Sequence, residues 1–257
     1  MDKPNTRLRT SFPSARWPTR WRSPRGGESA TDTTSARPVG YLVNHPSGLS
    51  GSQGVGFDYV LGAGGVYVQS ESAHLTARVI VAPCEVRGLA PVVEKVELAH
   101  GPIPARLFEI GLLWFRDAPG TERFFAVRWD GDAYRPVVPP LDGTATSLTY
   151  RPPSGVVAEF HSHGSSRAFF SKTDDRDEQG FRVYGVVGRL DTPEPELSLR
   201  VGVYGHFAPV DWPQVFDGPP PGVRLVNEEP DSNQARDKEV IECLTTWTTR
   251  SCSTTPG

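Results

Sequence analysis

The chain has 257 residues, a formal net charge of −3 and 37% hydrophobic residues. This length accommodates one large domain or two small ones. The weak negative charge argues against a general binder of polyanions such as nucleic acid, and no window approaches the roughly 18 consecutive apolar residues of a membrane span. The three cysteines, Cys84, Cys243 and Cys252, are scattered and odd in number, which argues against a disulfide framework. We therefore expect a soluble, cytoplasmic protein that binds neither nucleic acid nor membrane.

The two ends of the chain differ in composition from its middle. Residues 1–38 are rich in Arg, Pro, Ser and Thr, and from Gly218 the chain again turns to Pro, Asn, Asp, Ser and Thr. Such stretches bury too little apolar surface to offset the entropy lost on ordering. We predict a disordered tail over 1–38 and a flexible tail over 218–257, with at most a short helix around Lys238–Trp247. The N-terminal stretch lacks the ~7–15-residue apolar core of a secretory signal.

Residues 39–100 consist of short apolar runs separated by glycines, such as Phe57–Leu61 and Gly65–Gln69. This pattern is typical of a small β-rich unit, with Gly62–Gly65 as a tight connection between two strands. The glycine-rich connection lacks the lysine of a phosphate-binding loop and opens no helix. We predict a strand-built N-terminal extension, for which binding of a substrate protein is one open role.

A helix and a hairpin are predicted next. Pro102–Ile103–Pro104 opens the helix, because proline is tolerated in the first turn, and 117–120 ends it. Its apolar stripe is expected to face a sheet and consists of Ile103, Leu107, Ile110 and Trp114. A strand over 121–129 then turns at Asp130–Gly131 into a returning strand, Tyr134–Val138.

The stretch from Glu159 to Asp175 carries the chemistry. Gly155–Phe160 reads as a strand, so the two-residue spacing puts His161 and His163 on one face. Asp174 lies eleven positions after His163, far enough for the chain to turn and return a carboxylate to the histidines. Two imidazole nitrogens and one carboxylate suit Zn²⁺ and leave the fourth tetrahedral position open, as in catalytic zinc sites.

A His-x-His pair by itself also occurs in other metalloproteins and in strands that bind nothing. A cupin would place a glutamate about four residues after the second histidine, where this chain has Arg167. An amidohydrolase barrel would need a βα repeat through a longer chain. Ser171 and Asp174 at their offsets make the combination more specific.

This combination resembles the signature of the JAMM metalloproteases of the JAB/MPN family. The residues that carry the resemblance are His161, Ser162, His163, Ser171 and Asp174. The commonest form of the signature has proline after the second histidine, whereas this chain has Gly164. The longer runs 168–175, 185–191 and 203–207 more closely resemble the prokaryotic JAB branch, which includes PRTRC-type proteins and the JAB peptidases of bacterial ubiquitin-like conjugation systems. The resemblance extends from about Ile103 to Phe216.

The resemblance implies an α+β fold: a JAB/MPN-type curved mixed β-sheet flanked by helices over 101–217, preceded by the β-rich extension over 39–100. It implies Zn²⁺ bound by His161, His163 and Asp174. Glu122, at the start of the strand after the first helix, would be the general base, with Glu159 as its first competitor and Glu109 as a second. Ser171 would donate a hydrogen bond to the oxyanion.

Other polar residues receive weaker interpretations. Ser162 points to the opposite face of the strand and is assigned no chemistry. Asp175 and Asp177 are candidates for orienting a ligand histidine, although a solvated acidic turn is the favoured explanation. The remaining histidines are interpreted as structural or surface residues: His45, His74, His100 and His206. Two strands are predicted after the site, Phe181–Leu190 and Leu197–Tyr204, in a sheet covered on one face.

The activity that the resemblance implies is hydrolysis of a peptide or isopeptide bond after the C-terminus of a ubiquitin-like protein, by maturation or deconjugation. The partners would be the modifier or its conjugates and the E1- and E2-like enzymes of the same system, in a setting such as bacterial antiviral defence. The alternatives are a PRTRC-type JAB protein with another target and a non-catalytic MPN scaffold. Such scaffolds usually lose a zinc ligand or the glutamate.

Overall fold

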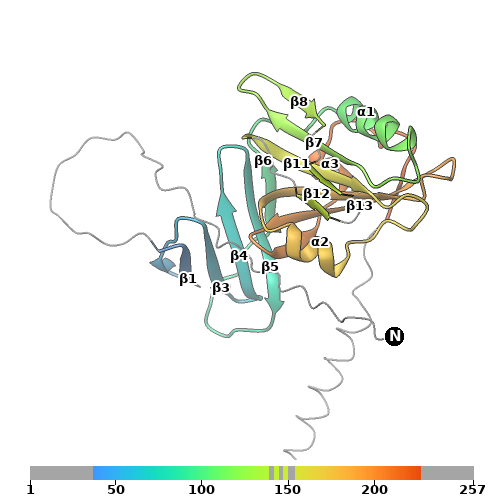
Figure 1. Cartoon of the computed structure of the whole chain (residues 1–257). Helices are drawn as coiled ribbons and strands as arrows, with labels where there is room; N and C mark the ends of the chain where they lie inside the picture. Colours follow the sequence, from blue (N-terminus) through green and yellow to red (C-terminus); the bar gives the residue numbers. More distant parts are fainter. Residues whose placement is uncertain (1–36, 139–141, 145–146, 150–153, 227–257) are drawn as a thin grey trace, which may run out of the picture. The chain divides into compact units, whose positions relative to one another are not determined.

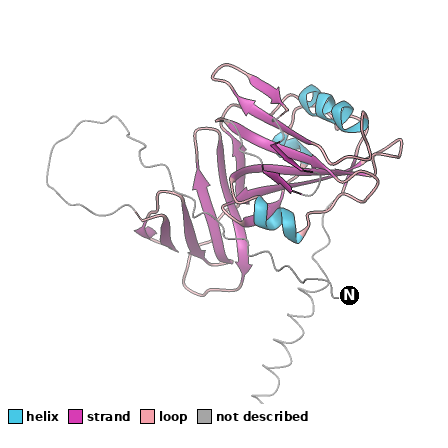
Figure 2. Ribbon diagram, viewed as in Figure 1, coloured by secondary structure: helices cyan, strands magenta, loops and turns pink. Residues whose placement is uncertain are grey.

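The computed structural model describes residues 37–138, 142–144, 147–149 and 154–226, most of which are strand or turn (Figure 1, Figure 2). By their contacts the described residues belong to one compact unit, and the predicted division at residue 100 stays a prediction. Residues 1–36 and 227–257, which hold most of both predicted tails, lie outside the described residues. Among the described helices, none is long and apolar enough to cross a membrane.

The first part of the chain forms a six-stranded sheet in the order β2-β1-β3-β4-β5-β6. Its strands are β1 (Val39–His45), β2 (Gly48–Ser52), β3 (Phe57–Gly62), β4 (Gly65–Glu71), β5 (Leu75–Pro83) and β6 (Lys95–Leu98). Gly62 pairs directly with Gly65 across the β3–β4 turn, which confirms the predicted tight connection. Arg37 and Pro38, placed in the tail by sequence, accept backbone hydrogen bonds from Val55 and Gly56.

The second sheet has seven strands, six of them in the order β14-β13-β12-β11-β7-β8, with β15 beside β13. Its strands are β7 (Phe124–Trp129), β8 (Tyr134–Val137), β11 (Val156–Ser162), β12 (Phe181–Gly188), β13 (Glu196–Val203), β14 (His206–Pro209) and β15 (Arg224–Leu225). A separate hairpin consists of β9 (Asp142–Thr144) and β10 (Ser147–Thr149). The pairs β11–β12 and β13–β15 are parallel and the others antiparallel, so the protein is α+β with a mixed sheet.

Helix α1 (Ala105–Arg116) ends at Asp117, as predicted, but its buried face is rotated from the predicted one. Ile103, predicted on its apolar stripe, precedes the helix and forms a buried β-bridge with Phe216. The buried residues are Leu107, Phe108, Gly111, Leu112 and Phe115, whereas Ile110 and Trp114 are partly exposed. Gly111 explains the rotation: a Cβ there would lie 2.6 Å from Phe125 Cδ1, so glycine allows the ring of β7 to approach the helix. The guanidinium of Arg123 covers the Trp114 ring at 4.0 Å from its centroid.

The two faces of the second sheet are filled by different kinds of side chain. Phe160 of β11 contacts the rings of Phe108, Phe125 and Phe216 on one face. The next residue, His161, points to the other face, toward Phe124 and Phe170. We call these the apolar face and the polar face. The prediction that β12 and β13 are covered on one face only was wrong, because nearly all of their residues are buried. A strand covered on both sides has a nearly continuous apolar run, as Val183–Gly188 does.

Three further features of the fold bear on the site. Helix α2 (Lys172–Asp177) follows the loop after β11, and helix α3 (Trp212–Val215) stacks Trp212 on Phe216 in the apolar core. The β7–β8 connection comprises four residues, because Trp129 pairs with Tyr134, so Asp130–Gly131 is only part of the turn. The flexible C-terminal tail was predicted to begin at residue 218. Strand β15 lies within it and pairs with β13, so the predicted start of the tail was too early.

Candidate metal centre

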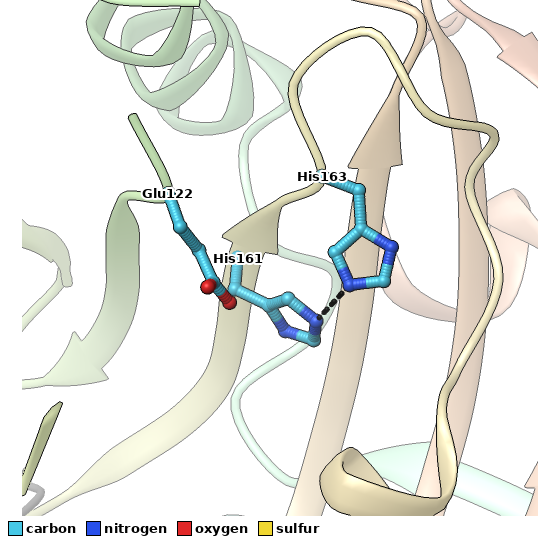
Figure 3. A group of neighbouring side chains, drawn as sticks. All are labelled: Glu122, His161 and His163. Carbon is cyan, nitrogen blue, oxygen red and sulfur yellow. Dashed lines mark hydrogen bonds between the residues drawn. The ribbon is translucent and has the colours of Figure 1, made fainter. Parts of the chain in front are cut away.

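The two histidines of the predicted site are brought together at the end of β11, a central strand. β11 pairs with β7 on one side and β12 on the other, so its backbone is fixed by both neighbours. His161 is buried within the strand and His163 is half-buried just beyond its end. Their Nε2 atoms lie 3.2 Å apart, as the dashed line in Figure 3 marks.

Asp174 lies in the first turn of α2, and the start of this short helix fixes its side chain. Ser171 is the N-cap: its Oγ accepts hydrogen bonds from the backbone N–H groups of Thr173 and Asp174, both at 3.2 Å. Asp174 Oδ2 accepts in return from the Ser171 N–H at 2.6 Å, which completes a capping box. Asp174 Oδ1 is 3.5 Å from His161 Nε2, and Oδ2 is 3.8 Å from His163 Nε2.

These spacings fit the ligand shell of one metal ion. Ligand atoms at about 2.0–2.2 Å from a tetrahedral zinc ion are roughly 3.3–3.6 Å from one another. The three contacts among His161, His163 and Asp174 measure 3.2, 3.5 and 3.8 Å. In the tautomers that carry the proton on Nδ1, both Nε2 lone pairs are available to a cation. The donor set and its spacing therefore suit a divalent metal.

The charges at the site favour the protonation states that a metal requires. Burial and the neighbouring His161 lower the pKa of His163, although Asp174 acts in the opposite direction. Burial raises the pKa of Asp174, but the hydrogen bond and charge of His161 and the bonds from Ser171 outweigh it, so that pKa lies well below its usual range. A neutral histidine and an ionised aspartate are the forms that bind a metal.

Glu122 approaches the histidines from another element. It lies in the exposed segment just before β7, and one of its carboxylate oxygens lies with a nitrogen of His161 and of His163 in a group whose atoms are all within 4.8 Å (Figure 3). The site thus has carboxylates from two elements, Asp174 from α2 and Glu122 from the segment before β7. The structure brings the three predicted ligands and the predicted base together.

A pocket of about 500 Å³ opens at this group. Glu122 lies in one wall with Pro119, Gly120 and Thr121, and His163, Ser171 and Asp174 lie in the other. The Ser171 hydroxyl accepts two backbone hydrogen bonds through its oxygen, and its own hydrogen can point into this pocket.

Gly164 explains the departure from the commonest form of the signature. Its φ is +58°, and a Cβ at this position would lie 2.7 Å from the carbonyl oxygen of Pro119. Proline fixes φ near −65°, so it cannot occupy this conformation. Glycine therefore allows the loop after β11 to approach the segment that carries Glu122.

Ser162, to which the sequence assigned no chemistry, connects the two walls. Its side chain is fully buried, and its Oγ accepts a hydrogen bond from the Arg123 N–H at 3.0 Å. The Ser162 N–H donates to the Arg123 carbonyl oxygen, also at 3.0 Å. These bonds hold the residue beside Glu122 against the strand that carries His161.

Glu178 is the contact that the sequence interpretation missed. It follows α2, and its Oε1 lies 3.6 Å from His161 Nδ1, the ring nitrogen that faces away from His163 and Asp174. Burial raises the pKa of Glu178 to about 7, while Arg200 and His161 act in the opposite direction. The sequence feature that could have revealed this contact is the i,i+4 spacing of Glu178 from Asp174, which places both side chains on one helical face.

The remaining candidates lie elsewhere or have other partners. Glu159 shares the polar face with His161, as predicted, but its carboxylate pairs with Arg182. Glu109 is exposed on α1, Asp177 is exposed, and Asp175 bonds Arg200 instead of a histidine. The other histidines stay outside the group: His206 bonds Tyr59, His74 contacts His100, and His45 is exposed.

The comparisons with known proteins give one match, to a family model. None of the curated proteins compared with the chain matches it. Residues 141–201 match the family model described as prokaryotic homologs of the JAB domain. The matched segment contains β11, α2 and both histidines, whereas Glu122 lies before it. The part of the chain that holds both histidines and Asp174 is therefore similar to the prokaryotic JAB domain.

Proposed function

We propose that this chain is a zinc-dependent JAMM-type peptidase that hydrolyses a peptide or isopeptide bond after the C-terminus of a ubiquitin-like protein. The observation that carries the proposal is the convergence of His161, His163 and Asp174, with contacts of 3.2–3.8 Å. His163 and Asp174 line a pocket together with Glu122 and Ser171. The family match supports the peptidase class. The JAB/MPN form of a curved sheet flanked by helices is part of the same proposal.

Each residue of the site has a distinct task in such a reaction. When bound, the metal acts as a Lewis acid that activates water and polarises the scissile carbonyl. Glu122, exposed at the pocket wall, accepts the proton of the attacking water and delivers it to the leaving amine. Ser171 donates its hydroxyl hydrogen to the developing oxyanion, which in a well-studied protease contributes about 2.7–4 kcal/mol per donor. No side chain forms a covalent acyl intermediate.

The substrate class follows from the resemblance of the motif to JAB peptidases of ubiquitin-like conjugation systems. We propose the modifier, its conjugates and the E1- and E2-like enzymes of the same system as partners, in bacterial antiviral defence. Gene neighbours sharpen this proposal: an adjacent ubiquitin-like reading frame supports it, whereas a plasmid-type PRTRC cluster supports a different target.

The decisive experiment compares three variants of the full chain for zinc content and cleavage. The substrates are ubiquitin-like proteins extended beyond their terminal glycine. We expect about one zinc per wild-type chain and none in His161→Ala/His163→Ala. Glu122→Gln should retain the zinc but lose about 10²–10⁴-fold in hydrolysis, the usual contribution of a general acid–base group.

His45→Ala is the matched control, because His45 is an exposed histidine outside the site. It should keep both zinc and cleavage. A wild-type chain without metal after zinc supplementation would overturn the metal site, and zinc without cleavage would favour a binding scaffold.

A further inference from the structure

The imidazole of His161 is contacted on both of its nitrogens. Nε2 faces His163 and Asp174, where the metal is proposed to bind. Nδ1 faces the Glu178 carboxylate at 3.6 Å. A carboxylate beside Nδ1 favours the tautomer with the proton on that nitrogen, which leaves the Nε2 lone pair free for a metal.

Arg200 fixes the Glu178 carboxylate from the neighbouring strand. Its Nε and Nη2 donate to Glu178 Oε2 at 3.1 and 2.7 Å, and its Nη1 donates to Asp175 Oδ1 at 2.6 Å. The Arg200 side chain, only 5% exposed, lies between the rings of Phe170 and Phe207, at 3.8 and 3.7 Å from their centroids. A guanidinium held on all sides leaves Glu178 little freedom to rotate.

We propose that Glu178, held by Arg200, is a positioning residue that orients His161 and sets its tautomer for metal binding. This inference rests on the metal site of the proposed function. In metalloproteins, the second nitrogen of a ligand histidine usually meets a carboxylate or carbonyl, and removal of that partner costs about 10–100-fold in metal affinity. Glu178 stands where such a partner is needed: its Oε1 lies 3.6 Å from Nδ1, just beyond hydrogen-bond distance, while Nε2 faces the other ligands.

A purely structural role of Glu178 predicts a different pattern of effects when carboxylates bonded to Arg200 are removed. In that case Glu178 only ties the end of α2 to β13 through Arg200, and loss of any carboxylate bonded to Arg200 should have the same effect. Asp175 tests this, because it lies on the same helix and bonds the same guanidinium. The carboxylate that lies 3.6 Å from His161 Nδ1, however, belongs to Glu178.

The experiment measures metal affinity in the full chain for wild type, Glu178→Gln and Asp175→Asn. Zn²⁺ affinity is obtained by competition with a chromophoric chelator, and Co²⁺ serves as a spectroscopic probe of the ligand geometry. We expect Glu178→Gln to bind Zn²⁺ about 10–100-fold more weakly and to change the visible Co²⁺ spectrum. Asp175→Asn should stay within about threefold of wild type, below the range for loss of a ligand-orienting partner.

Thermal unfolding of the metal-free proteins separates affinity from folding. If Glu178→Gln does not fold, Arg200→Lys takes its place, because it keeps the charge but loses the bidentate fork, and it should weaken Zn²⁺ binding in the same direction. Equal affinity in wild type and Glu178→Gln would overturn the inference, as would equal losses in Glu178→Gln and Asp175→Asn. A wild type that binds no metal would overturn the proposed function itself, which makes the two failures distinguishable.

Discussion

The apolar and polar faces of the second sheet are formed by the same strands but held in different ways. On the apolar face, Phe160 packs among aromatic rings, and shape and volume decide the fit. On the polar face, His161 and Arg200 are buried and depend on particular partners. Burial of charge is favourable only with complete pairing. The alternation of side chains along a strand thus separates the residues that stabilise the fold from those that could perform chemistry.

The largest expected effect is on the apolar face. Phe160→Ala should lower the free energy of unfolding by about 3–5 kcal/mol, because a fully buried ring leaves a cavity. Urea unfolding of the metal-free protein measures this loss. Phe169→Ala is the control: Phe169 is 48% exposed at the pocket, and its removal should cost less than about 1 kcal/mol. Equal losses in the two variants would contradict the assignment of Phe160 to the core.

An intermediate effect is expected on the polar face, with a pH dependence that the apolar face lacks. Arg200→Met keeps the apolar stem but leaves Glu178 without its cation, which should cost about 3 kcal/mol at pH 8. Burial raises the pKa of Glu178 from 4.5 to about 7 and Arg200 opposes this rise, so the variant should have a still higher pKa.

The sign follows from linkage. An acid whose pKa is raised by folding favours the folded state below its unfolded pKa, and this contribution is lost as the pH rises through the folded pKa. Because the pKa of Glu178 is about 7 in the wild type and higher in the variant, the stability deficit of metal-free Arg200→Met should be larger at pH 8 than at pH 5, with the increase above about pH 7. Unfolding curves at both pH values measure it, and a deficit independent of pH would rule out a stranded carboxylate as its cause.

The smallest expected effect lies where the two walls of the pocket meet. Ser162→Ala leaves the buried Arg123 N–H without its acceptor, which should cost about 1–2 kcal/mol of stability. Zinc content should be kept, whereas hydrolysis should fall because the segment beside Glu122 loses an anchor. Ser198→Ala, which removes a buried serine of β13, is the comparison. Equal rates of hydrolysis in the two variants would show that Ser162 does not help to position Glu122.

The sequence predicted the parts of the site that are set by local spacing. His161 and His163 are two apart on a strand, and Ser171 and Asp174 form a capping box, so short-range geometry brings each pair together. The start of the helix after Pro104 and the tight turn at Gly62–Gly65 follow equally local rules.

What the sequence left out depends on contacts between distant segments. Arg200 reaches Glu178 only because β13 lies beside β12, and Ser162 reaches Arg123 only because β11 pairs with β7. The prediction of the buried face of α1 was wrong for the same reason, because the need for glycine at position 111 arises only from the Phe125 ring beneath it. Spacing along the chain does not reveal such partners.

The placement of Glu122 has an evolutionary consequence. The proposed metal ligands belong to a strand end and a capped helix, whereas Glu122 is exposed and lies outside β7. In the proposed peptidase, a single substitution there abolishes turnover while the fold and the metal site persist, so a protein that only binds the proposed substrate is one mutation away. The same property would make Glu122→Gln a useful bait for isolating the uncleaved substrate from cells.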